Sequence, residues 1–288
     1  MKAKFLPLAF VTLLSTAAFA QDYAIKLHRP EKAGNEYKLS VTAKQSQAMD
    51  MAVNGVSQKN QKKEIEAQFD GTEKILEVDA KGKETKVTLT VEKFTVTTDG
   101  ASSEALPKGA VVTASMGADK KPAYEVDGKA VDPSAAQALS LVVELSKGGP
   151  TDDELFGTTD RKKKGESWTP DPAMIQKSLT ETADGAVVGD VNAKFTFDDV
   201  TGDAMTVNGH VTGSVKPPLP PSFTVDQSSM DVTLKGIFPV DVNKIPPAES
   251  DESMTFSFTA HTDAPSGEKV VMKMTMSQSA TRKVTAPK

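Results

Sequence analysis

Residues 254–276 read MTFSFTAHTDAPSGEKVVMKMTM, and this stretch decides which kind of fold the chain adopts. Apolar side chains stand at every second position from Met254 to Ala260 and again from Val270 to Met276. Alternation of this kind is typical of strands with one buried face, because successive side chains point to opposite sides of a sheet. The segment 263–268 between the two runs is polar and contains Pro and Gly, as loops do. The stretch therefore predicts a hairpin. With an alternating run over 230–240 before it, the chain is expected to end in an antiparallel meander.

The same pattern recurs upstream along the rest of the chain. Residues 37–53 keep their apolar side chains at odd positions, which predicts one long strand or two collinear strands ending before Gly55. In the run 87–96 the apolar phase changes from odd to even at Glu92-Lys93. A β-bulge at this point would turn the later side chains back to the buried face.

Two segments have the features of helices instead. Asp132 and Pro133 are suited to the start of a helix over 133–147, in which Leu139 and Val142 recur at helical spacing and form an apolar face. A second helix is expected from Pro172 to about residue 179. The predicted fold class is therefore mainly β (α+β), with long antiparallel hairpins in one or two curved sheets and one or two helices packed on a sheet face.

The chain is expected to divide into four segments. Residues 1–20 resemble a cleavable signal peptide, with Lys2 and Lys4 before an apolar run and small residues before a cut after Ala20. That run is shorter than the roughly 20 residues that a membrane-spanning helix needs. An N-terminal half over 21–148, a charged Gly/Pro linker over 149–165 and a C-terminal half over 166–288 follow. Whether the halves share one sheet or form two domains stays open.

The composition points to an exported protein that works without catalysis. The chain has no cysteine, so a cysteine-linked lipoprotein and thiol chemistry are excluded. Its net charge of −5 argues against a nucleic-acid partner. We expect a periplasmic or extracellular location, and no membrane-spanning segment, metal site or cofactor. The carboxylates Asp198, Asp199 and Asp203 allow a hydrolase as a third hypothesis, although their spacing favours a simple hairpin turn.

The candidate binding site is an apolar surface rich in methionine and phenylalanine. Methionine is flexible and adapts to irregular apolar partners. The surface would be either a packed core or a pocket in a curved sheet that holds an acyl chain or another apolar molecule. A structural or interaction protein of the cell surface, with a protein partner at a sheet edge, is the alternative. The candidate residues are Phe256, Phe258, Met272, Met274 and Met276, with Leu139 and Val142 from the expected helix.

Three short elements carry a resemblance to known proteins. The opening Tyr37-Lys38-Leu39 strand, the Gly165-Glu166-Ser167-Trp168 element and the Met-rich final hairpin resemble uncharacterised exported bacterial proteins built from long β-hairpins. Those proteins have no assigned activity. The expected architecture is also similar to that of the periplasmic lipoprotein carriers, whose open half-barrel with inner helices binds acyl chains. This second resemblance implies a lipid-like ligand, and it assigns no functional residue.

Overall fold

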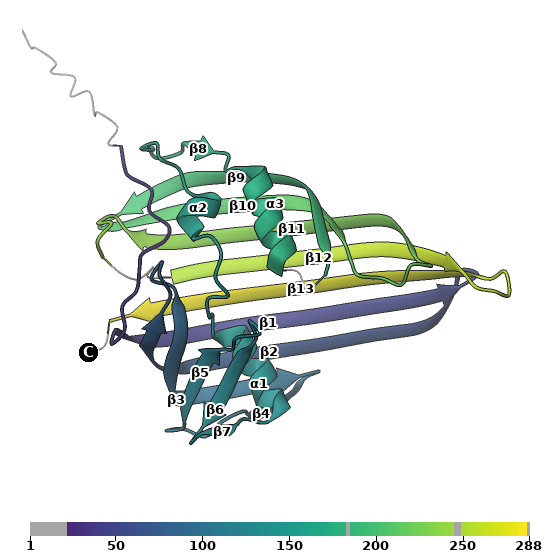
Figure 1. Ribbon diagram of the computed structural model, residues 1–288, viewed down its shortest axis with the longest axis horizontal. Helices are drawn as coiled ribbons and strands as arrows, with labels where there is room; N and C mark the ends of the chain where they lie inside the picture. Colours follow the sequence, from purple (N-terminus) through teal and green to yellow (C-terminus); the bar gives the residue numbers. More distant parts are fainter. Residues whose placement is uncertain (1–21, 183–184, 245–248, 287–288) are drawn as a thin grey trace, which may run out of the picture.

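The described part of the chain forms one large antiparallel sheet with three helices on one face (Figure 1). The computed structural model describes residues 22–182, 185–244 and 249–286, so the expected signal peptide lies outside the described residues. The strands follow the order β7-β6-β5-β3-β2-β1-β13-β12-β11-β10-β9-β8, and β4 pairs with β3. This arrangement confirms the predicted fold class.

The elements have the following bounds: β1 Glu36–Val53, β2 Val56–Val78, β3 Glu84–Thr98, β4 Ala101–Glu104, β5 Val111–Met116, β6 Pro122–Val126, β7 Lys129–Ala130, α1 Pro133–Val142, α2 Asp152–Phe156, β8 Ser167–Trp168, α3 Pro172–Thr182, β9 Val187–Thr201, β10 Ala204–Lys216, β11 Thr224–Pro239, β12 Glu249–Asp263 and β13 Lys269–Thr285. In the described residues no helix is long and apolar enough to cross a membrane.

The expected hairpins form, and the first and last long strands join them into one sheet. Strand β12 pairs with β11 on one side and β13 on the other, which confirms the C-terminal meander. Strand β13 then pairs with β1 from Lys38↔Thr285 to Val53↔Val270. The two expected halves therefore share a sheet, while the division at 149–165 stays a prediction.

The expected β-bulge lies in β3. Asp70 of β2 faces Lys93, and the next residue, Gly71, faces Val91, so Glu92 has no partner in β2. Because of this extra residue, Val91 and Phe94 both point into the core, where each is 1% exposed. The bulge returns the later apolar side chains of β3 to the buried face, as the sequence pattern indicates.

The helices start where the sequence predicts, but α1 is shorter than expected. Asp132 accepts hydrogen bonds from the first amides of α1. The helix ends at Val142 instead of 147, because the chain becomes extended at Val143 and the Ser146 amide donates to the Glu84 carbonyl at 2.6 Å. Helix α3 extends to Thr182. The expected linker contains α2, whose start is capped reciprocally by Thr151 and Glu154.

Two apolar cores lie on the helix-bearing face. Helix α1 packs on β1, β2 and β6 over the first core, and α3 packs on β9 over the second. Strands β12 and β13 run between these two helix-covered regions (Figure 1). In the second core the Phe195 ring lies against Gly209, where a Cβ atom would come within 2.3 Å of it. The sheet thus has two covered regions and a less covered middle.

Residues 22–31 cross the end of the sheet, and we call this segment the N-terminal strap (Figure 1, purple). The Leu27 amide donates to Asp153 Oδ1 at 2.7 Å. Arg29 donates to the Pro239 carbonyl at 2.8 Å, and the Glu31 amide donates to the Gly82 carbonyl at 2.8 Å. The strap therefore ties the ends of β11 and β3 to one another across the less covered middle of the sheet.

Candidate functional site

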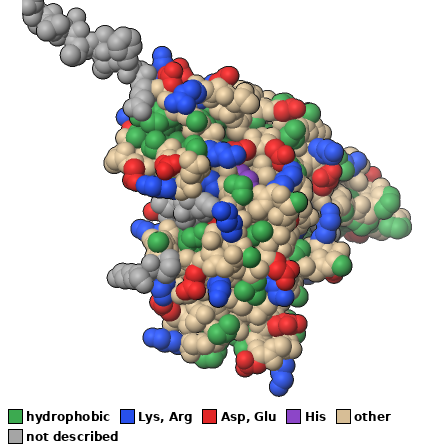
Figure 2. All heavy atoms as spheres, turned by 60° about the vertical axis from the view of Figure 1, so that its left-hand side comes forward, with side chains coloured by type: hydrophobic (Ala, Val, Ile, Leu, Met, Phe, Trp, Pro, Cys, Tyr) green, Lys and Arg blue, Asp and Glu red, His purple; other side chains and the backbone are tan. Residues whose placement is uncertain are grey.

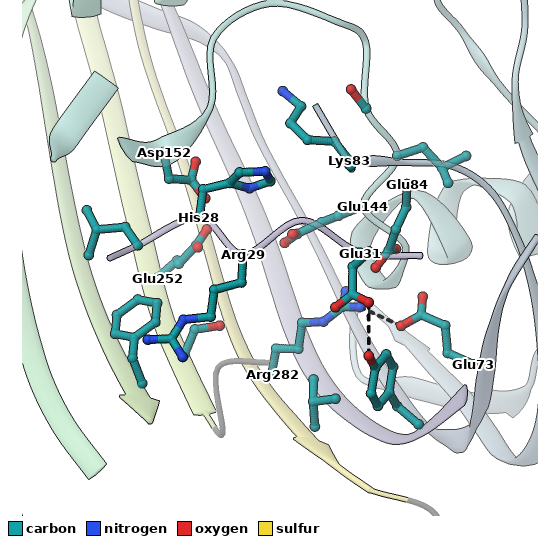
Figure 3. Close-up of a pocket in the computed structure, with 18 residues that line it drawn as sticks. His28, Arg29, Glu31, Glu73, Lys83, Glu84, Glu144, Asp152, Glu252 and Arg282 are labelled. Atoms are coloured by element: carbon teal, nitrogen blue, oxygen red, sulfur yellow. Dashed lines mark hydrogen bonds and ion pairs between the residues drawn. The ribbon is translucent and has the colours of Figure 1, made fainter. Parts of the chain in front are cut away.

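A cavity of about 380 Å³ opens where the two cores separate, beneath the N-terminal strap (Figure 3). Its walls come from the strap, from β1, β2, β3, β11, β12 and β13, from the turn before β3, and from the segment after α1 up to the first residue of α2. The ionisable residues that line it are His28, Arg29, Glu31, Glu73, Lys83, Glu84, Glu144, Asp152, Glu252 and Arg282. Carboxyl groups therefore outnumber the cationic groups in this cavity.

An ion pair between β2 and β13 forms part of the wall. Arg282 Nη2 donates to Glu73 Oε2 at 2.8 Å. Glu73 is only 1% exposed because it occupies a position in β2 that shares the buried face with Ile75. In the described part of the chain, Glu73 Oε1 and Arg282 Nη1 are buried without hydrogen-bond partners. Burial opposes the charge on Arg282, but the carboxylates of Glu73, Glu144 and Glu84 outweigh this effect and raise its pKa.

The other two long cations in the wall are engaged with backbone carbonyl groups. Arg29 is 5% exposed and donates to the carbonyls of Pro239, Asp241 and Lys244, and its guanidinium lies 5.9 Å from the centre of the Phe238 ring. Burial lowers its pKa. Lys83 Nζ donates to the Pro150 carbonyl at 3.1 Å. Both cations therefore hold loops in place.

Of the remaining carboxyl groups, Glu31 accepts hydrogen bonds from Asn35 Nδ2 at 2.7 Å and from the Tyr37 hydroxyl at 2.9 Å, whereas the other four have no such partners in the described chain. Among the described residues, no hydrogen bond or ion pair reaches the side chains of Glu84, Glu144, Asp152 and Glu252. Burial, followed by the charge of Glu73, raises the pKa of Glu84 to about 8. Burial, followed by Glu144 and Asp152, raises the pKa of Glu252 to about 7. The pKa of Asp152 is also raised by burial.

These groups are arranged around the space, as Figure 3 shows. His28, Asp152 and Glu252 lie at one side of the cavity, Glu73, Glu84 and Arg282 lie at the other, and Glu144 lies between them. The side chains of Glu252 and Asp152 keep contact with solvent inside the concavity, yet the surrounding protein limits their hydration. Limited hydration and mutual repulsion both favour protonated carboxyl groups.

A smaller apolar cavity of about 120 Å³ adjoins the charged one. The two share Leu27, Asp152, Phe238, Ser250 and Glu252 as wall residues. The other side chains of the smaller cavity are mainly apolar and include Phe156, Phe195, Val207 and Leu234. A charged space and an apolar space therefore meet near Glu252.

The sequence-predicted apolar residues fall into two groups. Leu139 and Val142 are 0% and 1% exposed beneath α1, so they belong to the first core and to neither cavity. The five residues of β12 and β13 lie together on the helix-bearing face, with Phe258 buried and the others half-buried. Met49 faces Met274 and Met51 faces Met272 across the β1–β13 pairing, which widens this surface. We call the group the Met/Phe strip: Phe256, Phe258, Met272, Met274, Met276, Met49 and Met51.

The strip does not line either of these two cavities, but Phe258 and Met274 help to line a separate hollow of about 720 Å³, whose other residues are polar and come from β10 to β13. It continues along the same face of β12 and β13 that carries Glu252 and Arg282. Its role in binding stays a prediction. Half-burial alone is compatible with a ligand or with a solvated apolar surface.

The aspartates of the third hypothesis lie elsewhere. Asp198 and Asp203 are exposed near the β9–β10 turn, and Asp199 accepts a hydrogen bond from Lys164 Nζ at 2.6 Å. They line neither cavity. In the described ranges, no group of three or more His, Asp or Glu residues is placed to hold a metal ion. Positive and negative side chains are interspersed over the surface seen in Figure 2.

Sequence reasoning missed the charged cavity, although one signal for it exists. Glu73 interrupts the buried phase of β2, and Arg282 does so in β13 beside Val284. A charged residue at a core position needs a partner. Two such residues in distant strands indicate a buried pair, but they do not reveal the space beside it.

The fold and the cavity define the class of protein: it has an open antiparallel sheet with helices on one face and a charged hollow between two cores. No family model and no curated protein matches the chain. Among solved structures, the chain is similar to lipovitellin in a structure described as "lipid-protein interactions in lipovitellin", with a TM-score of 0.37 and 10% identity. The match covers 89% of this chain and 26% of the lipovitellin chain. The chain thus spans about a quarter of that protein's length, and so low a likeness carries no argument about function.

Proposed function

We propose that the protein is an exported, non-catalytic binding protein that holds a small amphipathic ligand on the helix-bearing face of its sheet. The observation that carries this proposal is the meeting of the 380 Å³ charged cavity with an apolar cavity, on the face that also bears the Met/Phe strip. Pockets for small molecules commonly start at roughly 300 Å³ and combine apolar walls with a few polar groups. The exported location is part of the proposal and is supported by the resemblance of residues 1–20 to a signal peptide.

The arrangement of the two cores supports such a role. Helices α1 and α3 cover regions on either side of β12 and β13, where apolar side chains stay half-buried. Methionine side chains have several rotatable bonds and can fit apolar chains of different shapes. An apolar chain on this strip would remove from water the surface that the helices leave accessible.

The second candidate is an interaction protein that pairs with another chain through a sheet edge. Strand β8 pairs with β9 only at Phe195 and Thr196, so most of the outer side of β9 has no strand partner within the described chain. Unpaired edges of this length accept further strands. This candidate predicts a protein ligand and no saturable binding of small apolar molecules.

A neutral, environment-sensitive dye such as N-phenyl-1-naphthylamine tests the first candidate. We expect saturable fluorescence and a lower affinity, by at least about tenfold, in Met274→Glu, because a carboxylate on the strip opposes apolar binding. Ser279→Glu is the matched control, since this residue is exposed on the opposite face of β13 and lines none of these cavities. Native mass spectrometry of protein purified without detergent provides an independent measurement. No saturable dye site together with no bound small molecule would contradict the proposal.

A further inference from the structure

We propose that the charged cavity binds an ammonium group of the ligand, which makes the ligand class an amphipathic organic amine. This inference rests on the proposed function for the apolar part of the ligand. Its own basis is the set of unpaired carboxyl groups around the cavity, the engagement of the nearby cations, and a buried carboxylate oxygen without a partner.

The charge balance of the cavity favours a cationic guest. Glu84, Glu144, Asp152 and Glu252 have no partner among the described residues, whereas Arg29 and Lys83 donate to carbonyl groups and Arg282 pairs with Glu73 through Nη2, with only its Nη1 left without an acceptor. An ammonium group has three N–H donors and no acceptor. It can therefore donate to more than one oxygen on the side of the cavity where it binds, and hydrogen bonds between charged groups are stronger than neutral ones.

Glu73 provides a second, independent observation. Its side chain lines the cavity and is 99% buried, given an exposed fraction of 1%, and its Oε1 atom has no partner in the described chain. A buried acceptor left without a donor costs about 1–3 kcal/mol, and more when it is charged. A ligand donor that reaches Oε1 after a shift of the neighbouring side chains would remove this cost.

The geometry favours an organic cation over a metal ion. A metal ion needs several oxygen ligands within about 2.0–2.6 Å of one point. No group of acidic and histidine residues in the described ranges meets this requirement. The cavity of about 380 Å³ instead has room for a multi-atom group, and its carboxyl groups lie on opposite sides. The adjoining apolar cavity, reached beside Glu252, would take the start of the apolar chain.

The protonation states of the carboxyl groups in the cavity predict how this binding depends on pH. Glu84 faces Glu73 from β2, Arg282 from β13, Glu31 from the strap and Glu144 after α1. Glu252 faces Glu144, Asp152 and Arg282, with His28 and Arg29 also in the wall. The raised pKa values of Glu84 and Glu252 mean that both groups are partly protonated near pH 7. An ammonium group favours their ionised forms, so its binding releases protons and becomes tighter as the pH rises toward 8.

Calorimetric titration with n-octylammonium and with the uncharged n-octanol tests the inference. We expect octylammonium to bind at least about tenfold more tightly than octanol at pH 8. At pH 7 its binding enthalpy should depend on the ionisation enthalpy of the buffer, because protons are released. Equal affinities for the two probes, with octanol bound, would overturn the ammonium site and leave the proposed function standing. If neither octanol nor the neutral dye binds, the proposed function fails instead.

Two double variants distinguish binding in the cavity from attraction by the general negative charge of the protein. Glu84→Gln/Glu252→Gln should lower the octylammonium affinity to that of octanol and leave octanol binding unchanged. Asp198→Asn/Asp203→Asn neutralises two carboxylates on the exposed β9–β10 turn, at least as much charge as the cavity variant removes, and should leave both affinities unchanged. An equal loss in the two double variants would overturn the inference, because attraction would then not depend on the cavity. Thermal unfolding of each variant checks that it is folded.

Discussion

Glu73 shows how a single residue can shape the middle of this sheet. It replaces an apolar side chain at a buried position of β2 and requires Arg282, more than two hundred residues later, as its partner. A buried ion pair contributes little net stability, because both groups lose hydration, but the loss of one partner leaves a charge buried alone. The pair therefore makes the cavity wall polar. A variant that removes only one of the two partners should lose much of the free energy of unfolding.

We expect Arg282→Leu to lower the free energy of unfolding by about 3–5 kcal/mol at pH 8, because Glu73 is left buried beside Glu84. The double variant Glu73→Leu/Arg282→Leu should recover most of this loss. Lys283→Leu is the control, since Lys283 is exposed and its Nζ lies 3.9 Å from Glu249 Oε2. Urea unfolding measures all three. A loss under 1 kcal/mol in Arg282→Leu would show that the pair is not isolated from water.

The protonation of Glu84 links stability to pH. Its pKa is about 8 in the folded protein against an ordinary value of 4.5, so between these values the folded state holds a proton that the unfolded state has lost. The free energy of unfolding should therefore fall as the pH rises from about 4.5 through about 8. Glu84→Gln should flatten this decline and be more stable than the wild type at pH 8 by about 1–3 kcal/mol. Parallel stability curves for the two proteins between pH 5 and 8 would contradict this expectation.

At the scale of elements, the bulge at Glu92 keeps the apolar side of β3 continuous. Deletion of Glu92 would leave Val91 and Phe94 two positions apart, as in a regular strand, and would keep the β2 partners of both residues. We expect this deletion to cost about 1–2 kcal/mol, because the local twist of the strand is lost. The measurement is the urea midpoint of the purified variant.

Deletion of Thr90 provides the matched comparison. It would place Leu89 and Val91 next to each other and turn one of the two flanking runs away from the core. We expect this variant to lose more than about 3 kcal/mol or not to fold. Similar losses in the two deletions would contradict the role assigned to the bulge.

These elements also show which features the sequence can predict. The strands, the bulge and the start of α1 follow from local patterns: side-chain alternation, a change of phase, and the Asp132-Pro133 cap. The end of α1 depends on the Ser146–Glu84 hydrogen bond, which joins segments distant in sequence. The charged cavity depends on contacts between the strap, the sheet and α2, so no local pattern contains it. The Met/Phe strip could be placed on a face, but its degree of burial depends on where the helices lie.

On the scale of the whole molecule, the pairing of β1 with β13 makes the two expected halves depend on each other. Residues 149–288 alone would leave β13 with a free edge along the positions that pair with Lys38 to Val53. We expect this fragment to self-associate in size-exclusion chromatography, because a long unpaired strand accepts other strands. Co-expression with residues 22–148 should restore a soluble complex. A monomeric, folded fragment 149–288 would indicate that the C-terminal half is an independent domain.

The β1–β13 pairing also sets an order of events in time. A growing chain makes β1 early and cannot complete the centre of its sheet until the last strand has been synthesised. The hydrogen bonds that Arg29 donates to carbonyl groups of residues 239–244 likewise form only after that segment has been synthesised. Pairings between such distant segments form slowly. Strand β2 pairs with one side of β1 soon after both are made, so the nascent protein carries one open edge of β1 for most of its synthesis. A factor that shields this edge of residues 36–53 during the interval would raise the yield of folded protein.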